Sequence, residues 1–264
     1  MIKVAIINLK GGVGKSVTAC NLALGIPRQR PGSRVLVVDL DKQANTTKFF
    51  RRHNDRLPDT GDVLLQPEAV KDALRHTDWS GVDLLPASMG LLRANREVQM
   101  DCLHAQQNRL AKALALVEES YDLCLMDCPP DIDMATINAL CAADEILIPV
   151  DCDEWALDGL SEIISQIARI REGLNPKLHL LGCLVTMYTR TNDALRTVED
   201  LVGTGLPVFR TVIHRSTAVR DAKRCHQPVF TYKPRSAPAQ DYLALADELL
   251  QAVSIPDTKK EDVK

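Results

Sequence analysis

Residues 3–25 read KVAIINLKGGVGKSVTACNLALG, in which an apolar run is followed by three glycines within four positions and then by a helical pattern. A buried strand that leads through a glycine-rich turn into a helix is the context of a phosphate-binding loop. Glycines allow backbone N–H groups to converge on phosphate oxygens, and the positive N-terminal end of the helix attracts the same anion. A segment of this kind constrains the chain to an α/β fold, since the strand must be buried in a sheet that the helix covers.

Short β-rich runs alternate with helical patterns along the rest of the 264 residues. This alternation predicts a single-domain three-layer α/β sandwich, with a mostly parallel twisted sheet flanked by helices. We expect the domain to cover 1–253 and a flexible polar tail to cover 254–264. The predicted strands are 3–8, 34–39, 82–87, 121–127, 145–151, 178–186 and 207–213. The strongest helical patterns are 15–24, 91–119, 134–142, 156–172, 193–202 and 237–253.

Composition narrows the classes of protein to which the chain can belong. No stretch approaches about 18 uncharged apolar residues, and the N-terminus passes directly into a strand pattern. These features argue against a transmembrane helix, a signal peptide and a preceding helix-turn-helix domain. The eight cysteines include no C-x-x-C pair and lie mostly in apolar runs, which favours buried reduced thiols over disulfides or a metal centre. We therefore expect a cytoplasmic protein.

The glycine-rich loop departs from the usual pattern G-x-x-x-x-G-K-[ST], because Leu9 stands at the first glycine position and a second lysine, Lys10, follows it. Lys15 is expected to reach the β- and γ-phosphates of ATP, and the Ser16 hydroxyl to ligate Mg²⁺. A purely structural glycine turn is the alternative. The predicted nucleotide-binding residues are Lys10, Gly11, Gly12, Val13, Gly14, Lys15, Ser16 and Val17.

A nucleotide site of this type needs carboxylates at the ends of neighbouring strands, which hold the metal and its waters and place the attacking water. The segment VLVVDLDKQANTT ends a β-rich run with Asp39 and then Asp41, and YDLCLMDCPPD ends another with Asp127. An aspartate at a strand end is equally compatible with a helix cap or a turn. Beside a phosphate loop, however, Asp39 and Asp127 are favoured as metal-site residues together with Ser16.

Three motifs in order resemble those of the ParA/MinD ATPases. KGGVGKS resembles the family's deviant Walker A motif, K-G-G-x-G-K-[ST], DLDKQAN resembles its D-x-D-x-Q-x-N segment, and LMDCPP resembles its Walker B motif. The similarity continues through TINALCAADEILIPVDCDEWALDGL, LLGCLVTMY and VFRTVIHRSTAVRDA, and so covers roughly residues 2–253. The resemblance implies the P-loop NTPase fold and a Mg²⁺-dependent ATPase that hydrolyses ATP.

The same resemblance implies roles for individual residues. Lys10 would reach across a homodimer interface to the nucleotide of the partner subunit, while an ordinary solvated lysine is the alternative. A second cation aimed at the same phosphates repels Lys15 unless ATP is bound, so dimerisation would depend on ATP. Asp41 would orient the attacking water, Asp39 and Asp127 would act around Mg²⁺, and the γ-phosphate would be sensed by Gln43 and Asn45. Lys10, Lys15 and Asp41 are thus the expected catalytic residues.

Two residues depart from the family pattern. Asp131 follows the Pro-Pro of the third motif, where ParA proteins more often have a small or polar residue, and we assign it no role. His214 stands where many relatives have a proline whose backbone tends to contact adenine. The residues that recognise the base therefore stay open.

Positive charge is concentrated near the C-terminal end of the predicted domain. The basic window, residues 210–235, contains seven lysines and arginines and one acid, so it carries +6, while the whole chain carries −3 and the remainder therefore −9. This pattern is typical of a phosphate-backbone binder, although a solvated basic face is the alternative. ParA dimers bind DNA non-specifically through the corresponding region, but Ala218 replaces a residue that is often basic in chromosomal relatives. The candidate DNA contacts are Arg215, Arg220, Lys223 and Arg224.

Taken together, the motifs predict a ParA-type ATPase that positions DNA or another large cargo over the nucleoid. By resemblance, a ParB-like centromere-binding or adaptor protein would stimulate its hydrolysis.

Three other classes of protein are the alternatives. A MinD-like membrane-cycling protein would need a basic amphipathic C-terminal helix, which IPDTKKEDVK does not supply. An iron–sulfur carrier would need a cysteine in a glycine setting after the third motif, where the chain has Met134 and Ala135. A metabolic ligase of the dethiobiotin synthetase type would need neither Lys10 nor the basic window. The cargo itself stays open.

Overall fold

One seven-stranded sheet forms the centre of the computed structural model, which describes residues 1–152 and 156–253. Its strand order is β3-β4-β2-β5-β1-β6-β7, and every neighbouring pair is parallel except β3 and β4. The predicted three-layer α/β fold is confirmed. The strands are β1 Ile2–Ile6, β2 Val35–Asp39, β3 Arg75–His76, β4 Val82–Leu85, β5 Leu123–Asp127, β6 Glu145–Asp151 and β7 His179–Thr186.

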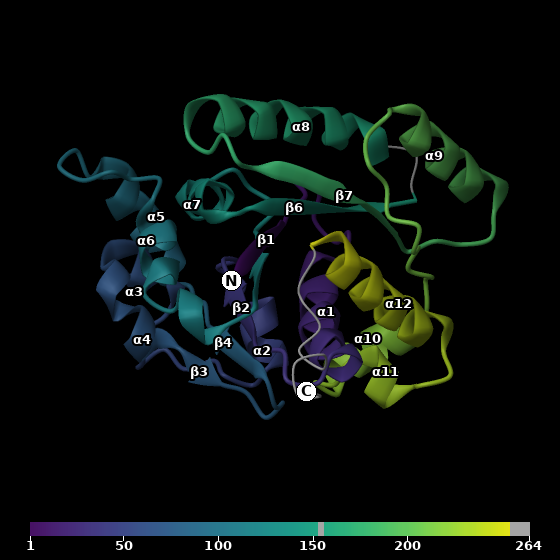
Figure 1. The fold of residues 1–264 in the computed structure, drawn as a ribbon, viewed down its shortest axis with the longest axis horizontal. Helices are drawn as coiled ribbons and strands as arrows, with labels where there is room; N and C mark the ends of the chain where they lie inside the picture. The colour runs from purple at the N-terminus through teal and green to yellow at the C-terminus, as the bar shows by residue number, and fades with distance from the viewer. Residues whose placement is uncertain (153–155, 254–264) are drawn as a thin grey trace, which may run out of the picture.

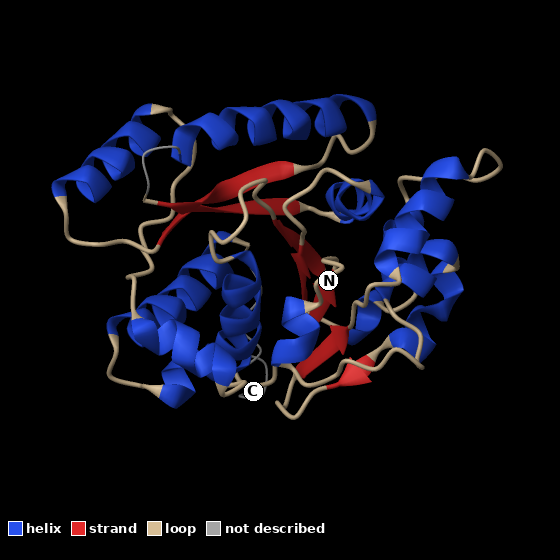
Figure 2. Ribbon diagram, turned by 180° about the vertical axis from the view of Figure 1, so that it is seen from behind, coloured by secondary structure: helices blue, strands red, loops and turns tan. Residues whose placement is uncertain are grey.

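Helices cover both faces of the sheet, as Figures 1 and 2 show. One face packs against α1 Lys15–Gln29, α2 Asn45–Phe49, α10 Thr217–Arg224, α11 Val229–Tyr232 and α12 Ala237–Ala252. The other face packs against α3 Thr60–Leu65, α4 Val70–Ala73, α5 Leu91–Met100, α6 Arg109–Ala115, α7 Met134–Ala142, α8 Ala156–Gly173 and α9 Asn192–Gly203. Two short 3₁₀ helices cover Pro67–Ala69 and Glu118–Ser120. Central strands buried on both faces explain the nearly continuous apolar runs in the sequence.

The single helix predicted over 91–119 is wrong, because α5 ends at Met100 and α6 begins at Arg109. Asp101 causes the interruption. Its side chain accepts hydrogen bonds from the backbone N–H groups of Leu103 and His104 and forms an ion pair with Arg109. Side-chain acceptors of this kind compete with the helical hydrogen bonds, so the chain leaves the helix for eight residues.

The strand predicted over 207–213 is also wrong. Isolated bridges join this region to β7 and the residues after it, from Val208 to Cys183 and from His214 to Tyr188. The N–H groups of Phe209 and Ile213 donate to the carbonyls of Cys183 and Val185, both at 2.9 Å. The N–H groups of Arg210 and Thr211 donate instead to the carboxylate of Glu248, at 2.8 and 3.0 Å. The side chain of Glu248 on α12 therefore interrupts the pairing with β7 between Phe209 and Ile213, and no continuous strand forms.

The sheet order places the candidate site at the carboxyl ends of three adjacent central strands. β1 lies between β5 and β6, and β2 lies on the other side of β5. The register pairs Asp39 with Asp127, so the predicted carboxylates are neighbours. Within the described ranges, none of the helices is both long and apolar enough to cross a bilayer. The tail predicted over 254–264 lies outside the described residues.

Candidate nucleotide site

The phosphate loop, residues 9–14, connects β1 to α1. Gly12 and Gly14 have φ angles of +85° and +91°, in the left-handed region where glycine is favoured. A Cβ atom added to Gly11 or Gly12 would meet no other heavy atom within 4 Å, so the loop is open on that side. This open, glycine-lined concavity is suited to an anion that approaches the backbone closely.

The first turn of α1 follows the loop directly, and no side chain of the cap or the turn accepts hydrogen bonds from its free N–H groups. Gly14 occupies the N-cap position, so no side chain caps the helix, and the first turn contains no acidic residue. The first N–H groups of a helix have no partner inside the helix and form its positive end. The chain therefore presents uncapped donors where the sequence predicts the phosphates.

Lys15 is buried beneath the loop. Its ammonium donates hydrogen bonds to the backbone carbonyls of Asn8 and Lys10, at 2.8 and 3.0 Å. Burial lowers the pKa of Lys15, and the nearby carboxylates, Asp127 foremost, oppose this change. An ammonium held among carbonyl dipoles under the loop is placed to act on phosphate oxygens above it.

Asp39 and Asp127 are fully buried at the ends of β2 and β5. Asp39 accepts hydrogen bonds from the N–H and hydroxyl of Thr47, at 2.8 and 2.7 Å, and Asp127 accepts one from the Thr46 hydroxyl at 2.7 Å. Burial, reinforced by the charge of Asp127, raises the pKa of Asp39 to about 7. Burial also raises the pKa of Asp127 to about 6, although hydrogen bonds from Thr46 and Ser16 oppose the change.

The donor set fits a magnesium ion. Asp127 Oδ1 is buried and has no hydrogen-bond partner among the described residues, while Oδ2 is bonded to Thr46. The Ser16 hydroxyl lies beside the same carboxylate. Mg²⁺ prefers oxygen ligands and is usually held by one or two carboxylates together with substrate phosphates and water. Ser16, Asp39 and Asp127 are the residues that would hold the ion or its waters.

The two carboxylates give a prediction for the protein without nucleotide and Mg²⁺. Because their folded pKa values lie above the unfolded value, their contribution to stability is complete below about pH 4 and is lost as the pH rises to about 7. Asp127→Asn keeps an acceptor for Thr46 and removes one charge. This variant should unfold at a higher urea concentration than the unchanged protein at pH 8, with a smaller difference at pH 4. If the urea midpoints of the two proteins differ by the same amount at every pH from 4 to 8, the pKa values of the buried carboxylates are not raised.

Asp41 lies at the start of the segment that leads into α2. Its N–H donates to Asp39 Oδ1 at 3.1 Å, and its own Oδ1 accepts from the N–H of Gln43 at 2.9 Å. Gln43 is exposed and Asn45 is half-buried. The structure therefore brings Asp41, which is 9% exposed, next to the fully buried pair.

Lys10 occupies the opposite rim of the phosphate loop. Its side chain is 34% exposed, and its ammonium pairs with the carboxylate of Asp151 at the end of β6, at 3.1 Å. The N–H of Lys10 donates to the side chain of Asn8, which in turn donates to the carbonyl of Pro149. Lys10 is thus directed away from Lys15, toward the surface next to β6.

Known proteins of similar sequence identify the family of this chain. A family model described as an AAA domain matches residues 1–180. The sporulation initiation inhibitor protein Soj of Bacillus subtilis is 36% identical over 249 residues, which cover 93% of this chain and 97% of the relative. The chromosome partitioning protein ParA of Caulobacter vibrioides is 36% identical over 251 residues, with 93% and 92% covered. The chain belongs to the ParA/Soj family.

Solved structures extend the comparison. Cobyrinic acid a,c-diamide synthase from Mycobacterium smegmatis, with bound ATP analogue and magnesium, has a TM-score of 0.83 and 31% identity, and 96% of each chain is covered. The cell division ATPase MinD of Pyrococcus furiosus has a TM-score of 0.77 and 23% identity, covering 95% of this chain and 98% of that one. The second likeness concerns the fold alone. The predicted P-loop fold of the ParA/MinD ATPases is confirmed.

Several residues of this ParA-family site were missed by the sequence interpretation. Thr46 and Thr47 hold the buried carboxylates, Asn8 ties the phosphate loop to β6, and Asp151 is the partner of Lys10. Two adjacent threonines after the D-x-D segment were the available signal, because hydroxyls are common donors to buried carboxylates. Asp131, to which no role was assigned, pairs with Lys42 at 3.2 Å.

A hollow of about 610 Å³ adjoins the phosphate loop at the expected base end of the site. Its lining includes Gly14, Val17, Thr186, His214 and Arg215. The N–H and Nδ1 of His214 both bond to Asp241 Oδ2, at 2.9 Å. The departure from proline at this position is therefore accommodated by a carboxylate on α12, and His214 lies beside the space that a base would occupy.

The predicted DNA contacts lie in or just before α10, on the same side of the sheet as α1. The side chains of Arg215, Arg220, Lys223 and Arg224 are exposed. Arg220 has a long contact of 3.7 Å with Asp221. Arg215, Arg220 and Lys223 also line the hollow beside the phosphate loop, whereas Arg224 is outside its lining. The four cations are therefore grouped, but three of them adjoin the candidate nucleotide site.

Proposed function

We propose that this ParA/Soj-family protein binds ATP with Mg²⁺, forms a sandwich homodimer in the ATP state, and binds DNA non-specifically until slow hydrolysis releases it. The observation that supports this most is the pair of lysines at the phosphate loop. Lys15 is buried under the loop, while Lys10 lies at its rim and points away from Lys15. Magnesium would neutralise phosphate charge when bound, and Asp41 would orient the attacking water.

The position of Lys10 supports the proposed dimer. At the rim of the loop, the ammonium of Lys10 pairs with the carboxylate of Asp151 at 3.1 Å. The γ-phosphate of a nucleotide in a facing subunit offers it a stronger charge-assisted contact. In a two-fold symmetric pair this contact is made twice, so the energy gained from ATP is doubled at the interface.

DNA binding is assigned to the exposed cations around α10. A window of +6 on a chain of −3 provides a local positive field without general attraction to nucleic acid. Phosphate contacts of this kind read no bases, so binding should be insensitive to sequence. Arg220 and Arg224 are the first contacts to test, and Arg215 belongs to the same group of exposed cations.

The dimer would act on the nucleoid with a partner. A ParB-like centromere-binding or adaptor protein would stimulate hydrolysis, split the dimer and so release the DNA. Repeated cycles of this kind position a chromosome, a plasmid or another large cargo. Curated relatives named for chromosome partitioning support chromosome segregation as the first function to test.

ATP should be required for DNA binding. A monomer that contacts few phosphates binds weakly at physiological salt, and joining two basic windows in one dimer should raise the affinity by about 10²-fold or more. Retention of unrelated DNA fragments is measured with ATP, ADP or no nucleotide, at about 50 and 200 mM salt. We expect retention only with ATP, a steep loss at the higher salt, and no preference among fragments.

Reversing the charge of exposed arginines on α10 tests whether this helix forms the DNA-binding surface. Arg220→Glu with Arg224→Glu should abolish DNA retention while ATP-driven dimerisation, followed by light scattering, persists. The matched control is Arg93→Glu with Arg96→Glu on α5, which changes the net charge equally on exposed residues that lie on the opposite face of the sheet. Equal DNA binding with ADP and ATP, or equal loss in both double variants, would contradict the proposal.

A further inference from the structure

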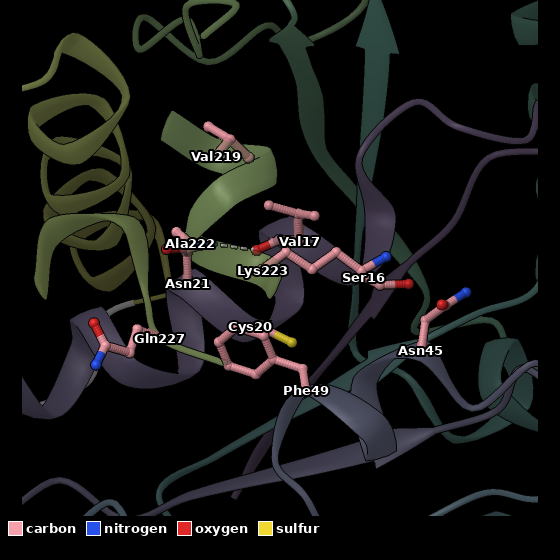
Figure 3. A pocket seen from close by; sticks show the side chains of 10 residues that line it. All are labelled: Ser16, Val17, Cys20, Asn21, Asn45, Phe49, Val219, Ala222, Lys223 and Gln227. Atoms are coloured by element: carbon pink, nitrogen blue, oxygen red, sulfur yellow. Dashed lines mark hydrogen bonds between the residues drawn. The ribbon is translucent and has the colours of Figure 1, made fainter. Parts of the chain in front are cut away.

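Helix α10 places one lysine of the basic window against the start of α1. A small hollow between the two helices is lined by Ser16, Cys20 and Asn45 on one side and by Ala222 and Lys223 on the other. Figure 3 shows the Lys223 side chain extended across the first turn of α1 toward Ser16. The Lys223 side chain is exposed, and its ammonium lies at the end of the candidate nucleotide site.

A second observation places the charge of Lys223 close to α1. Burial raises the pKa of the Cys20 thiol well above its usual value, and the positive charge of Lys223 is near enough to oppose that change. Cys20 lies one helical turn after Ser16. Lys223 also lines the larger hollow together with Gly14 and Val17, at the base end of the loop.

The charge of Lys223 has no carboxylate partner among the described ion pairs. Its neighbour Arg220 has Asp221, and Lys42 on the other side of the site has Asp131. An exposed lysine without a partner is ordinary at a surface, but this one is directed into a concave site built to receive an anion. Ser16 lines the same hollow as Lys223 and belongs to the uncapped first turn of α1.

We propose that Lys223 binds the phosphate chain of the nucleotide within its own subunit, on the α- and β-phosphate side. Lys15 approaches the phosphates from beneath the loop, and the loop backbone cradles the α- and β-phosphates. Lys223 approaches from the exposed side of the same α1 turn. This inference rests on nucleotide binding in the proposed function, and it removes Lys223 from the DNA contacts.

The placement has two consequences. Because ADP contains both phosphates, Lys223 should strengthen ADP and ATP binding alike, in contrast to a residue that senses the γ-phosphate. Asn45, at the start of α2, lines the same hollow, so a nucleotide held by Lys223 also contacts the segment that follows Asp41. Helix α10 then links the nucleotide directly to the basic window.

The test measures the dissociation constants of Mg-ADP and of a slowly hydrolysed Mg-ATP analogue by calorimetry. Loss of one charge-assisted contact should weaken both by about tenfold or more in Lys223→Ala, with partial recovery in Lys223→Arg. Lys71→Ala on α4 is the matched control, because Lys71 is an exposed lysine outside both hollows and on the opposite face of the sheet. Thermal unfolding without nucleotide checks that all three variants are folded.

Two results would overturn the inference. One is a nucleotide affinity in Lys223→Ala equal to that of Lys71→Ala. The other is unchanged nucleotide affinity with lost DNA retention at saturating ATP, which would make Lys223 a DNA contact. Failure of the unchanged protein to bind either nucleotide would instead refute the proposed function, so the two failures are distinguishable.

Discussion

Lys10→Ala should abolish ATP-driven dimerisation while the monomer keeps its affinity for ATP. Truncating one member of a charged pair across an interface costs about 2–5 kcal/mol, and a two-fold dimer contains the Lys10 contact twice. The dimer constant should therefore weaken by more than about 10³-fold. In the monomer, by contrast, Lys10 is held by Asp151 at the rim and leaves the phosphates to Lys15.

The experiment compares three variants by light scattering and by nucleotide titration. Lys15→Ala should lose ATP binding itself, so it should fail in both assays. Asp151→Asn removes the carboxylate charge that holds Lys10 within its own subunit and should leave dimerisation intact. A Lys10→Ala protein that dimerises normally with a slowly hydrolysed ATP analogue would show that Lys10 does not act across the interface.

Asp41→Ala should keep ATP binding and dimerisation while hydrolysis collapses. Loss of a group that orients and deprotonates an attacking water typically costs about 10²–10⁴-fold in rate. Asp41 lies next to the buried carboxylates, but its bonds to Asp39 and Gln43 are local, so its removal should disturb the loop little. The variant should consequently retain DNA with ATP for longer than the unchanged protein.

Phosphate release under single-turnover conditions measures this effect. Asp131→Ala is the control, because Asp131 is also a carboxylate near the site but pairs with Lys42. Its turnover should stay within about twofold of the unchanged protein, as expected for an exposed ion pair. Unchanged turnover in Asp41→Ala would remove Asp41 from the mechanism.

The order of the elements and the core of the site could be predicted because their causes are local. Glycines and a lysine between a strand pattern and a helix pattern specify the phosphate loop, and Asp39 and Asp127 end strands that the fold makes neighbours. The bounds of α7 agree with the prediction at both ends. Helix α1 runs five residues further than predicted, to Gln29.

The predicted and observed elements differ where a single side chain, or one distant in the sequence, determines the local backbone conformation. Asp101 interrupts the predicted helix, and Glu248 accepts hydrogen bonds from two N–H groups in the middle of the predicted strand. The same reason explains the missed partners in the site. Asp151 pairs with Lys10 although the two residues are 141 positions apart in the chain. Lys223 and Ser16 line the same hollow only because α10 packs beside α1. Periodicity and spacing within a segment contain no information about such pairs.

The internal bonds of the phosphate loop have a consequence for how fast nucleotide binds. Lys15, the side chain of Asn8 and the Thr186 hydroxyl all bond to the loop or its flanks. The conformational entropy of these residues is thus lost when the chain folds rather than when ATP arrives. A site already ordered in this way should exchange ADP for ATP without a slow rearrangement, which leaves hydrolysis and dimer separation to set the duration of each cycle.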